Sequence, residues 1–215
     1  AFGLKRQGIN ISAACASSTI AVTQACAMIQ SGTAEVVLVC SADLVTEFVF
    51  SGFSALGALS ATPCKPFDRD RSGLSLGEGA VALLLMNTKR AEAEGRVPLG
   101  RVCGWGAAND AFHVTAPAPD GSGLSQAIRQ ALTCAGLEKE AVCAVCAHGT
   151  GTVSNDAMEL KALRDCFGDP ARARFPVFSV KGAIGHTLGA AGGIEIVLSL
   201  NVLSQQVAPP TVGFS

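Results

Sequence analysis

The stretch GINISAACASS, residues 8–18, joins two different patterns and decides the fold class. Residues 8–12 alternate β-branched and polar side chains, which is typical of a short strand. Apolar residues then recur at helical spacing over 19–30, and Gly32 marks a plausible end of that helix. Cys15 lies at the junction, where a helix start offers unpaired N–H groups and the positive end of its dipole. Both favour a thiolate, so the position predicts that Cys15 is a nucleophile.

Two of the three histidines lie in glycine-rich turns that follow apolar strand patterns. His148 follows the apolar run 142–147, and His186 follows a short strand pattern over 177–180 and precedes an apolar helix pattern. In open α/β sheets, sites form beyond the carboxyl ends of the strands. One cysteine and two histidines at three such ends suit acyl transfer through a thiol. Taken singly, a buried core cysteine or a structural histidine is the alternative.

The rest of the chain alternates between strand and helix patterns. Apolar runs predict strands over 36–40, 80–86, 99–108, 142–147 and 177–180. Amphipathic or apolar periodicity predicts helices over 88–94, 121–135, 156–167 and 190–203. Alternation of buried strands with helices indicates an α/β fold.

Composition narrows the function classes. The 215 residues are 49% hydrophobic and 15% charged with a net charge of −1, so the sequence predicts a packed core and neither a nucleic-acid nor a membrane partner. We find no uninterrupted apolar stretch of membrane-spanning length. The nine cysteines lack disulfide spacing, and reduced core thiols in a cytoplasmic protein are expected. Cys143 and Cys146 have no second pair at zinc-finger spacing, so no metal site is predicted.

Several motifs, in order, carry a family resemblance. They are the segment around Cys15, GFSALGALS at 52–60, PFDRDRSG at 66–73 with GEGA at 77–80, AHGTGT at 147–152, and Lys181 followed by GH at 185–186. Together they resemble the β-ketoacyl-acyl carrier protein synthases, condensing enzymes of the thiolase-like superfamily. The resemblance covers nearly the whole chain and implies a five-layered α-β-α-β-α arrangement of two similar halves. Since family members are about twice as long, we expect residues 1–87 to be the end of the first half, with the nucleophile. Residues 88–215 are expected to be most of the second half, without its final loop.

The resemblance also implies a reaction. Cys15 would take an acyl group from the phosphopantetheine arm of acyl carrier protein, with its own N–H in the oxyanion hole. Malonyl-carrier protein would then lose CO2, while His148 and His186 donate hydrogen bonds to the developing enolate. The carbanion would attack acyl-Cys15 and lengthen the chain by two carbons. No cofactor is implied beyond the carrier-bound substrates.

Supporting roles follow from the same resemblance. Lys181 would pair with Glu195 and order the site, with an ordinary solvated lysine as the alternative. Asp156 and Glu159 fit a D-x-x-E capping box, with a contact to Lys181 as the alternative. Three further residues are expected near the substrate. Thr150 and Thr152 would lie along the pantetheine arm or satisfy turn backbone. Phe53 would belong to both the core and the acyl-pocket wall.

The resemblance implies a homodimer, or a heterodimer with a ketosynthase-like subunit, in which residues 9–14 pair as strands across a two-fold axis. Three alternatives compete with this interpretation. A chain-length-factor-like or decarboxylating subunit lacks the nucleophile, so Cys15 argues against it. A thiolase would have a second late cysteine in place of one histidine. A non-catalytic scaffold subunit is the rival from another class, and acylation of Cys15 would distinguish it.

Overall fold

The structure is a computed structural model that describes residues 8–169 and 175–215. Its helices are α1 (Ser17–Gln30), α2 (Glu47–Ala55), α3 (Thr88–Ala93), α4 (Ser122–Ala135), α5 (Val153–Phe167), α6 (Lys181–Ile184) and α7 (Ala191–Gln205). Its strands are β1 (Val36–Asp43), β2 (Gly79–Met86), β3 (Val145–Cys146) and β4 (Val177–Phe178). Single 3-10 turns occupy Lys139–Ala141 and Leu188–Ala190.

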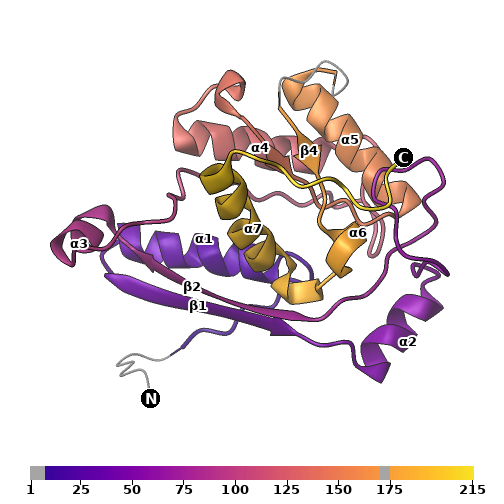
Figure 1. Ribbon diagram of the computed structural model, residues 1–215, viewed down its shortest axis with the longest axis horizontal. Coiled ribbons are helices and arrows are strands. Elements are labelled where there is room, and N and C mark those ends of the chain that lie inside the picture. The colour runs from indigo at the N-terminus through magenta and orange to yellow at the C-terminus, as the bar shows by residue number, and fades with distance from the viewer. Residues whose placement is uncertain (1–7, 170–174) are drawn as a thin grey trace.

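Strands β1 and β2 form a long antiparallel ribbon, and helix α1, which follows Cys15, packs on one face of it. Val37 pairs with Leu85 and Val39 with Leu83, so alternate residues of both strands face the same side. On that side Val39 is buried together with residues of α1, and α7 packs against β2 (Figure 1). This burial fixes α1, and with it Cys15, relative to the sheet.

The opposite face of the ribbon is also apolar and lies open. The same register pairs Leu38 with Leu84 and Cys40 with Ala82 on this side. Leu84 is 52% exposed, and Cys40 is an exposed thiol. Because most monomers do not expose contiguous apolar surface of this kind, the face is suited to being covered by further protein.

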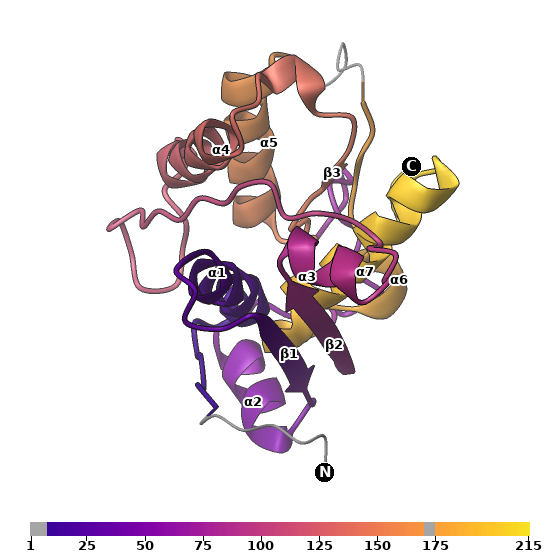
Figure 2. The same cartoon turned by 90° about the vertical axis from the view of Figure 1, so that its left-hand side faces the viewer.

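Helices α4 and α5 make a second group, best separated in Figure 2, where they pack together away from the ribbon. The parallel strands β3 and β4 connect this group to α6 and α7. The two groups meet where α7 crosses α1. There a Cβ on Gly192 would lie 2.0 Å from Thr19 Oγ1, so only glycine permits this approach.

Several strand predictions are wrong or too long. Residues 8–12 make no strand hydrogen bonds among the described residues, and since the expected partner of 9–14 is a second copy, this strand stays a prediction. Residues 99–108 form no strand either and run close along α4, where Cβ atoms on Gly104 and Gly106 would meet helix backbone oxygens at 2.5 Å and 2.0 Å. The runs 142–147 and 177–180 shorten to the two-residue strands β3 and β4.

The stretch Leu188–Gln205 has the length and mean hydropathy, 1.3, of a membrane-spanning helix. Its position in the fold gives another reason for that apolar character. It packs against α1 and β2, and Glu195 in its middle forms an ion pair with buried Lys181. α7 is thus packed against the fold on one side and buried at its start.

Candidate active site

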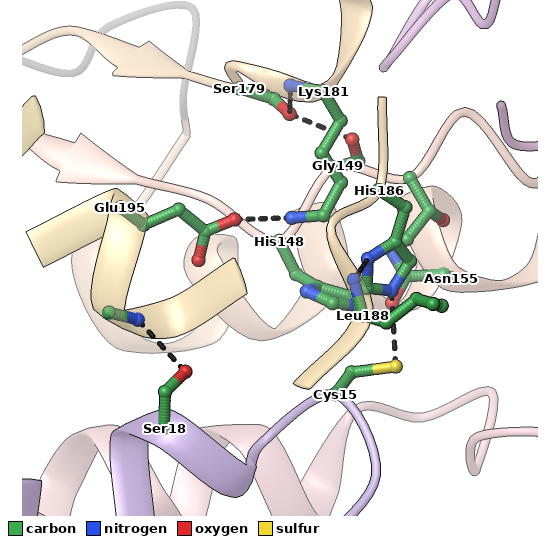
Figure 3. A network of polar contacts seen from close by, with 12 residues as sticks. Cys15, Ser18, His148, Gly149, Asn155, Ser179, Lys181, His186, Leu188 and Glu195 are labelled. Carbon is green, nitrogen blue, oxygen red and sulfur yellow. Dashed lines mark hydrogen bonds and ion pairs between the residues drawn. The ribbon is translucent and has the colours of Figure 1, made fainter. Parts of the chain in front are cut away.

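A tight turn presents Cys15 just before α1. Ala14 adopts φ +48°, a left-handed conformation that non-glycine residues seldom take. Ser17 secures the turn, since its Oγ accepts the Ala13 N–H (2.8 Å) and donates to the Ala14 carbonyl (2.6 Å). The strained backbone at Ala14 is the kind that accumulates at functional sites. It projects the Cys15 side chain away from α1 and toward the loop that carries His186 (Figure 3).

His186 contacts the thiol directly, and its tautomer follows from its backbone partner. Its Nε2 lies 3.1 Å from Cys15 Sγ, across 171 residues of sequence. The Leu188 N–H donates to its Nδ1 (3.1 Å), so Nδ1 is an acceptor. In a neutral imidazole the other nitrogen then carries the proton, which makes Nε2–H the donor toward Sγ.

His148 completes the pair of imidazoles. Its ring meets that of His186 edge to face, with centroids 5.1 Å apart. Burial lowers the pKa of His186 to about 4, with the charge of Lys181 as the next cause. Burial, followed by Lys181 and His186, lowers the pKa of His148 well below its usual value. Both histidines are therefore neutral at physiological pH, as an N–H donor to a developing oxyanion should be.

The ligand atoms of Cys15, His148 and His186 lie within 4.8 Å of one another, close enough to consider a metal ion. The tautomer of His186 opposes that use. A metal on Nε2 would place the proton on Nδ1, which would then face the Leu188 N–H donor. The three side chains fit a thiol with two proton donors better than a ligand set.

One electrostatic expectation is wrong. The helix start was expected to lower the pKa of Cys15, but burial raises it above its ordinary value. The Lys181 charge opposes that rise without overcoming it. The thiol also lies two residues before the first residue of α1, and the N–H groups of Ala16 and Ser17 are already bonded to the carbonyls of Ala13 and Ala14. The resting group is therefore a thiol.

Lys181 lies behind the two histidines and pairs with Glu195 as expected. Its ammonium is buried and contacts Glu195 Oε1, as the dashed line in Figure 3 shows. Burial raises the pKa of Glu195, and Lys181 lowers it. Ser179 supports the same region, because its Oγ accepts the Lys181 N–H (3.2 Å) and donates to the Gly149 carbonyl (2.8 Å).

Asp156 and Glu159 clamp the loop of His148, and the capping-box prediction is wrong. α5 begins at Val153, so both carboxylates lie inside it and reach back to the preceding loop. Glu159 accepts the N–H groups of His148 (2.6 Å) and Gly149 (2.7 Å). Asp156, fully buried, accepts the N–H groups of three further residues: Thr150, Gly151 and Phe67. These bonds hold the histidine loop at the start of α5.

The three residues expected to contact substrate have local contacts in the structure. Thr150 is buried, and its Oγ1 lies 2.9 Å from Thr152 Oγ1, so the hydroxyls satisfy one another within the turn. Phe53 is half-buried on α2, a helix with no fully buried residue that projects from the body in Figure 1. Contacts of these three residues with a substrate stay a prediction.

Other contacts to the site were not predicted. The His186 N–H donates to the Ser75 carbonyl (2.7 Å), and the Gly77 N–H donates to the His186 carbonyl (3.0 Å). Ser18 Oγ accepts the Gly193 N–H (2.9 Å) and ties α1 to α7. The GEGA motif was the available signal for the first pair of bonds, while no sequence pattern marks Ser18.

All nine cysteines lie in the described residues and are free thiols. Cys40 and Cys143 are exposed, so the expectation that they are core thiols is wrong. Burial raises the pKa of half-buried Cys146 to about 12, which leaves it protonated and unsuited to metal binding at neutral pH.

Comparison with known proteins gives family matches over most of the chain. Residues 1–91 match the model of the β-ketoacyl synthase N-terminal domain, and residues 99–215 match that of the C-terminal domain. A 3-oxoacyl-[acyl-carrier-protein] synthase 2 of Staphylococcus aureus is 38% identical over 203 residues, which are 91% of this chain and 49% of that protein. The Synechocystis protein of the same name is 36% identical over 93% of this chain and 49% of its own length. The chain thus spans about half the length of these relatives.

Solved structures give the same answer for the fold. A β-ketoacyl synthase from Burkholderia phymatum has a TM-score of 0.89 and 33% identity over 95% of this chain and 50% of its own. A type II PKS acyl-carrier protein in complex with its ketosynthase has a TM-score of 0.93 and 29% identity over 97% of this chain and 53% of that one. These neighbours confirm the predicted α/β, thiolase-like fold. With both domain models matched and the Cys-His-His site in place, the chain belongs to the β-ketoacyl synthase family.

Proposed function

We propose that this protein is a β-ketoacyl-ACP synthase that catalyses the decarboxylative Claisen condensation of an acyl-enzyme with malonyl-ACP. One observation carries the proposal: Cys15 Sγ lies 3.1 Å from Nε2 of a neutral histidine, with a second neutral histidine against it. A nucleophile beside two N–H donors can serve both halves of that reaction.

In the first half, Cys15 Sγ attacks the thioester carbonyl of an acyl-ACP. The bond between the acyl carbon and the carrier sulfur breaks, and the carrier thiol leaves with the proton that Cys15 gives up. Burial favours the thiol in the resting site, while the Nε2–H of His186 and the Lys181 charge stabilise thiolate as it forms. The product is acyl-Cys15.

In the second half, malonyl-ACP loses CO2 and negative charge develops on its thioester oxygen. The N–H groups of His148 and His186 would stabilise this enolate. The carbanion attacks the carbonyl of acyl-Cys15, the bond to Sγ breaks, and the β-ketoacyl chain leaves on the carrier. The Cys15 thiolate takes a proton from solvent. Because each malonyl unit loses its carboxyl group, one CO2 is released for each two carbons added.

The proposal includes partners and surroundings. Relatives named 3-oxoacyl-[acyl-carrier-protein] synthase 2 and a ketosynthase solved with its acyl-carrier protein support a carrier-protein partner. We propose a dimer, either of two copies or with a ketosynthase-like subunit, since one solved neighbour is a ketosynthase in complex with its chain length factor. A cytoplasmic protein that uses no cofactor beyond carrier-bound substrates fits this chemistry.

The alternative is a non-catalytic or decarboxylating subunit, and a labelling experiment separates it from the enzyme. The protein is expressed from its natural reading frame, incubated with acyl-ACP, digested and analysed by mass spectrometry. We expect the acyl mass on Cys15 and, after malonyl-ACP is added, CO2 and a β-ketoacyl-ACP. Cys15→Ala is the control and should lose the adduct. Active protein without an adduct on Cys15 would refute the proposal, and CO2 release without condensation would favour the alternative.

A further inference from the structure

Asp43 connects the end of β1 to the histidine loop. It is the last residue of the strand, opposite Gly79 in the ribbon, and it is half-buried. Its Oδ2 accepts the Gly189 N–H at 2.9 Å, across 146 residues of sequence, and its Oδ1 accepts the adjacent Leu44 N–H at 3.0 Å. The first of these bonds joins the ribbon to the loop that carries His186.

That loop determines which way His186 presents its proton. Leu188 adopts φ +53°, an unfavourable conformation for a branched side chain, and in this conformation its N–H donates to His186 Nδ1. Backbone strain of this kind persists only where surrounding bonds hold it. Gly189 is the next residue, so a bond to its N–H acts directly on the Leu188 peptide.

The loop also passes close to the turn that presents Cys15. A Cβ added to Gly189 would lie 3.1 Å from Asp43 Oδ2 and 3.7 Å from the Ala14 carbonyl oxygen. Asp43 therefore contacts the loop at the point where it passes the turn that presents Cys15. A small displacement of the loop here changes both the Leu188 N–H direction and the distance from His186 to Sγ.

We propose that Asp43 is a positioning residue: by anchoring Gly189 it holds Leu188 in the conformation that fixes His186 as the Nε2–H tautomer directed at Cys15. The consequence for turnover rests on the proposed function, whereas the consequence for the tautomer does not.

The charges around the site support a geometric role rather than an electrostatic one. The Asp43 charge raises the pKa of both Cys15 and His186, which works against a thiolate and against a neutral imidazole. Lys181 from α6 lowers both values, and Glu195 from α7 raises that of Cys15. The negative charge of Asp43 is thus unfavourable for both a Cys15 thiolate and a neutral His186. Its favourable contribution to the site is the hydrogen bond to the Gly189 N–H.

The test compares Asp43→Ala with Asp43→Asn in the protein from its natural reading frame. Both variants remove the charge, but the asparagine oxygen can still accept the Gly189 N–H while the exposed Leu44 N–H turns to water. For decarboxylation of malonyl-ACP we expect kcat to fall about tenfold or more in Asp43→Ala, with KM within about twofold, because a misplaced donor affects the transition state most. We expect Asp43→Asn to retain activity within about threefold, as its hydrogen bond survives.

Two further measurements make the result decisive. Glu78→Gln is the matched control, because Glu78 Oε1 accepts a nearby N–H, that of Val45 (2.8 Å), without touching the loop. It should stay within about twofold of wild type, because the Glu78 side chain is exposed and a glutamine oxygen can still accept the Val45 N–H. Nitrogen-15 NMR of His186 should show the Nε2–H tautomer in wild type and a mixture in Asp43→Ala.

Each outcome bears on a distinct claim. Wild-type activity or an unchanged His186 tautomer in Asp43→Ala would overturn the inference, as would an equal loss in Glu78→Gln. If the wild-type protein itself released no CO2, the proposed function would fail, and the tautomer of His186 in the two Asp43 variants would still decide the role of Asp43.

Discussion

At the scale of single residues, burial moves the pKa values of Cys15 and His186 in opposite directions. It raises that of the thiol and lowers that of the imidazole to about 4. Both groups are therefore uncharged at neutral pH, and the pair is not the thiolate–imidazolium pair found in many thiol enzymes. A neutral His186 keeps its proton on Nε2 and remains a donor for each half of the proposed reaction.

The raised pKa of Cys15 predicts slow alkylation at neutral pH. Since only the thiolate reacts, the rate with iodoacetamide should climb with pH and show no plateau up to pH about 9. Peptide-level mass spectrometry can follow Cys15 beside the exposed thiols Cys103 and Cys134, which should label faster at pH 7. A plateau for Cys15 below pH about 8 would mean that the helix start, rather than burial, governs this thiol.

The two histidines should separate acylation from decarboxylation. His148→Ala and His186→Ala should still form acyl-Cys15, because neither ring is needed as a base for a thiol that can lose its proton to the leaving carrier. CO2 release from malonyl-ACP should fall by about 10²–10³, the usual effect of removing one oxyanion donor. His113→Ala, in an exposed loop, serves as the control. Wild-type decarboxylation in either site variant would refute the role assigned to that residue.

At the scale of elements, α5 does more than pack against α4. Two carboxylates on its inner side accept five backbone N–H groups, four of them from the loop 148–151 and one from Phe67. Burial raises the pKa of Glu159, while those backbone bonds lower it. The helix therefore fixes the backbone of the loop that carries His148.

Removing Glu159 should damage both stability and the site. Glu159→Ala leaves the N–H groups of His148 and Gly149 without their acceptor, which we expect to lower the free energy of unfolding by about 2–4 kcal/mol. Lys161→Ala is the control on the same helix, since its pair with Asp165 is partly exposed and should contribute no more than about 0.5 kcal/mol. Urea unfolding measures both. Equal stability of the two variants would show that the clamp is energetically unimportant.

The sequence predicted helices better than strands, for a physical reason. A helix is specified locally, by periodicity and a stop: α4 ends at Ala135 and Gly136 follows in the left-handed conformation, as its pattern indicates. A strand needs a partner, and the apolar run 99–108 has none among the described residues. Residues 48–59 are rich in Phe and Gly and show no clear periodicity, yet they contain most of α2, with Thr46 as its N-cap.

The motifs predicted that three side chains meet, but they did not predict the hydrogen bonds that orient those side chains. His148 and His186 follow the neighbouring parallel strands β3 and β4, so their meeting follows from the topology of the fold, and the turn before α1 brings Cys15 to them. The bonds from Asp43 and Ser75 to the histidine loop connect residues more than a hundred positions apart, and no local pattern encodes such contacts. The pKa of Cys15 was mispredicted for the same reason, because burial depends on distant segments.

At the scale of the whole molecule, the site exists only where the two groups of elements meet. The segment 75–77 pairs with His186, Ser18 with Gly193, and Asp43 with Gly189. The ribbon, the nucleophile helix and α7 should consequently unfold together rather than in turn.

Gly77→Ala tests this coupling. A Cβ there would lie 2.2 Å from the Ile184 carbonyl oxygen, so the segment must move away from His186. We expect a loss of about 1–3 kcal/mol together with a fall in decarboxylation. Gly52→Ala, in α2 with open space around it, is the control and should be neutral or slightly stabilising. Differential scanning calorimetry and the CO2 assay compare them. Lost stability with full activity would show that the segment does not position His186.

The long sequence separation between Cys15 and His186 has a consequence during synthesis. A ribosome that adds about 5–20 residues each second needs roughly 10–30 s to pass from the first to the second. Throughout that interval the nascent cysteine lacks the burial that raises its pKa in the finished fold, and it is open to oxidants and electrophiles. Completion of α7 ends that exposure, so the same event that assembles the site also protects its nucleophile.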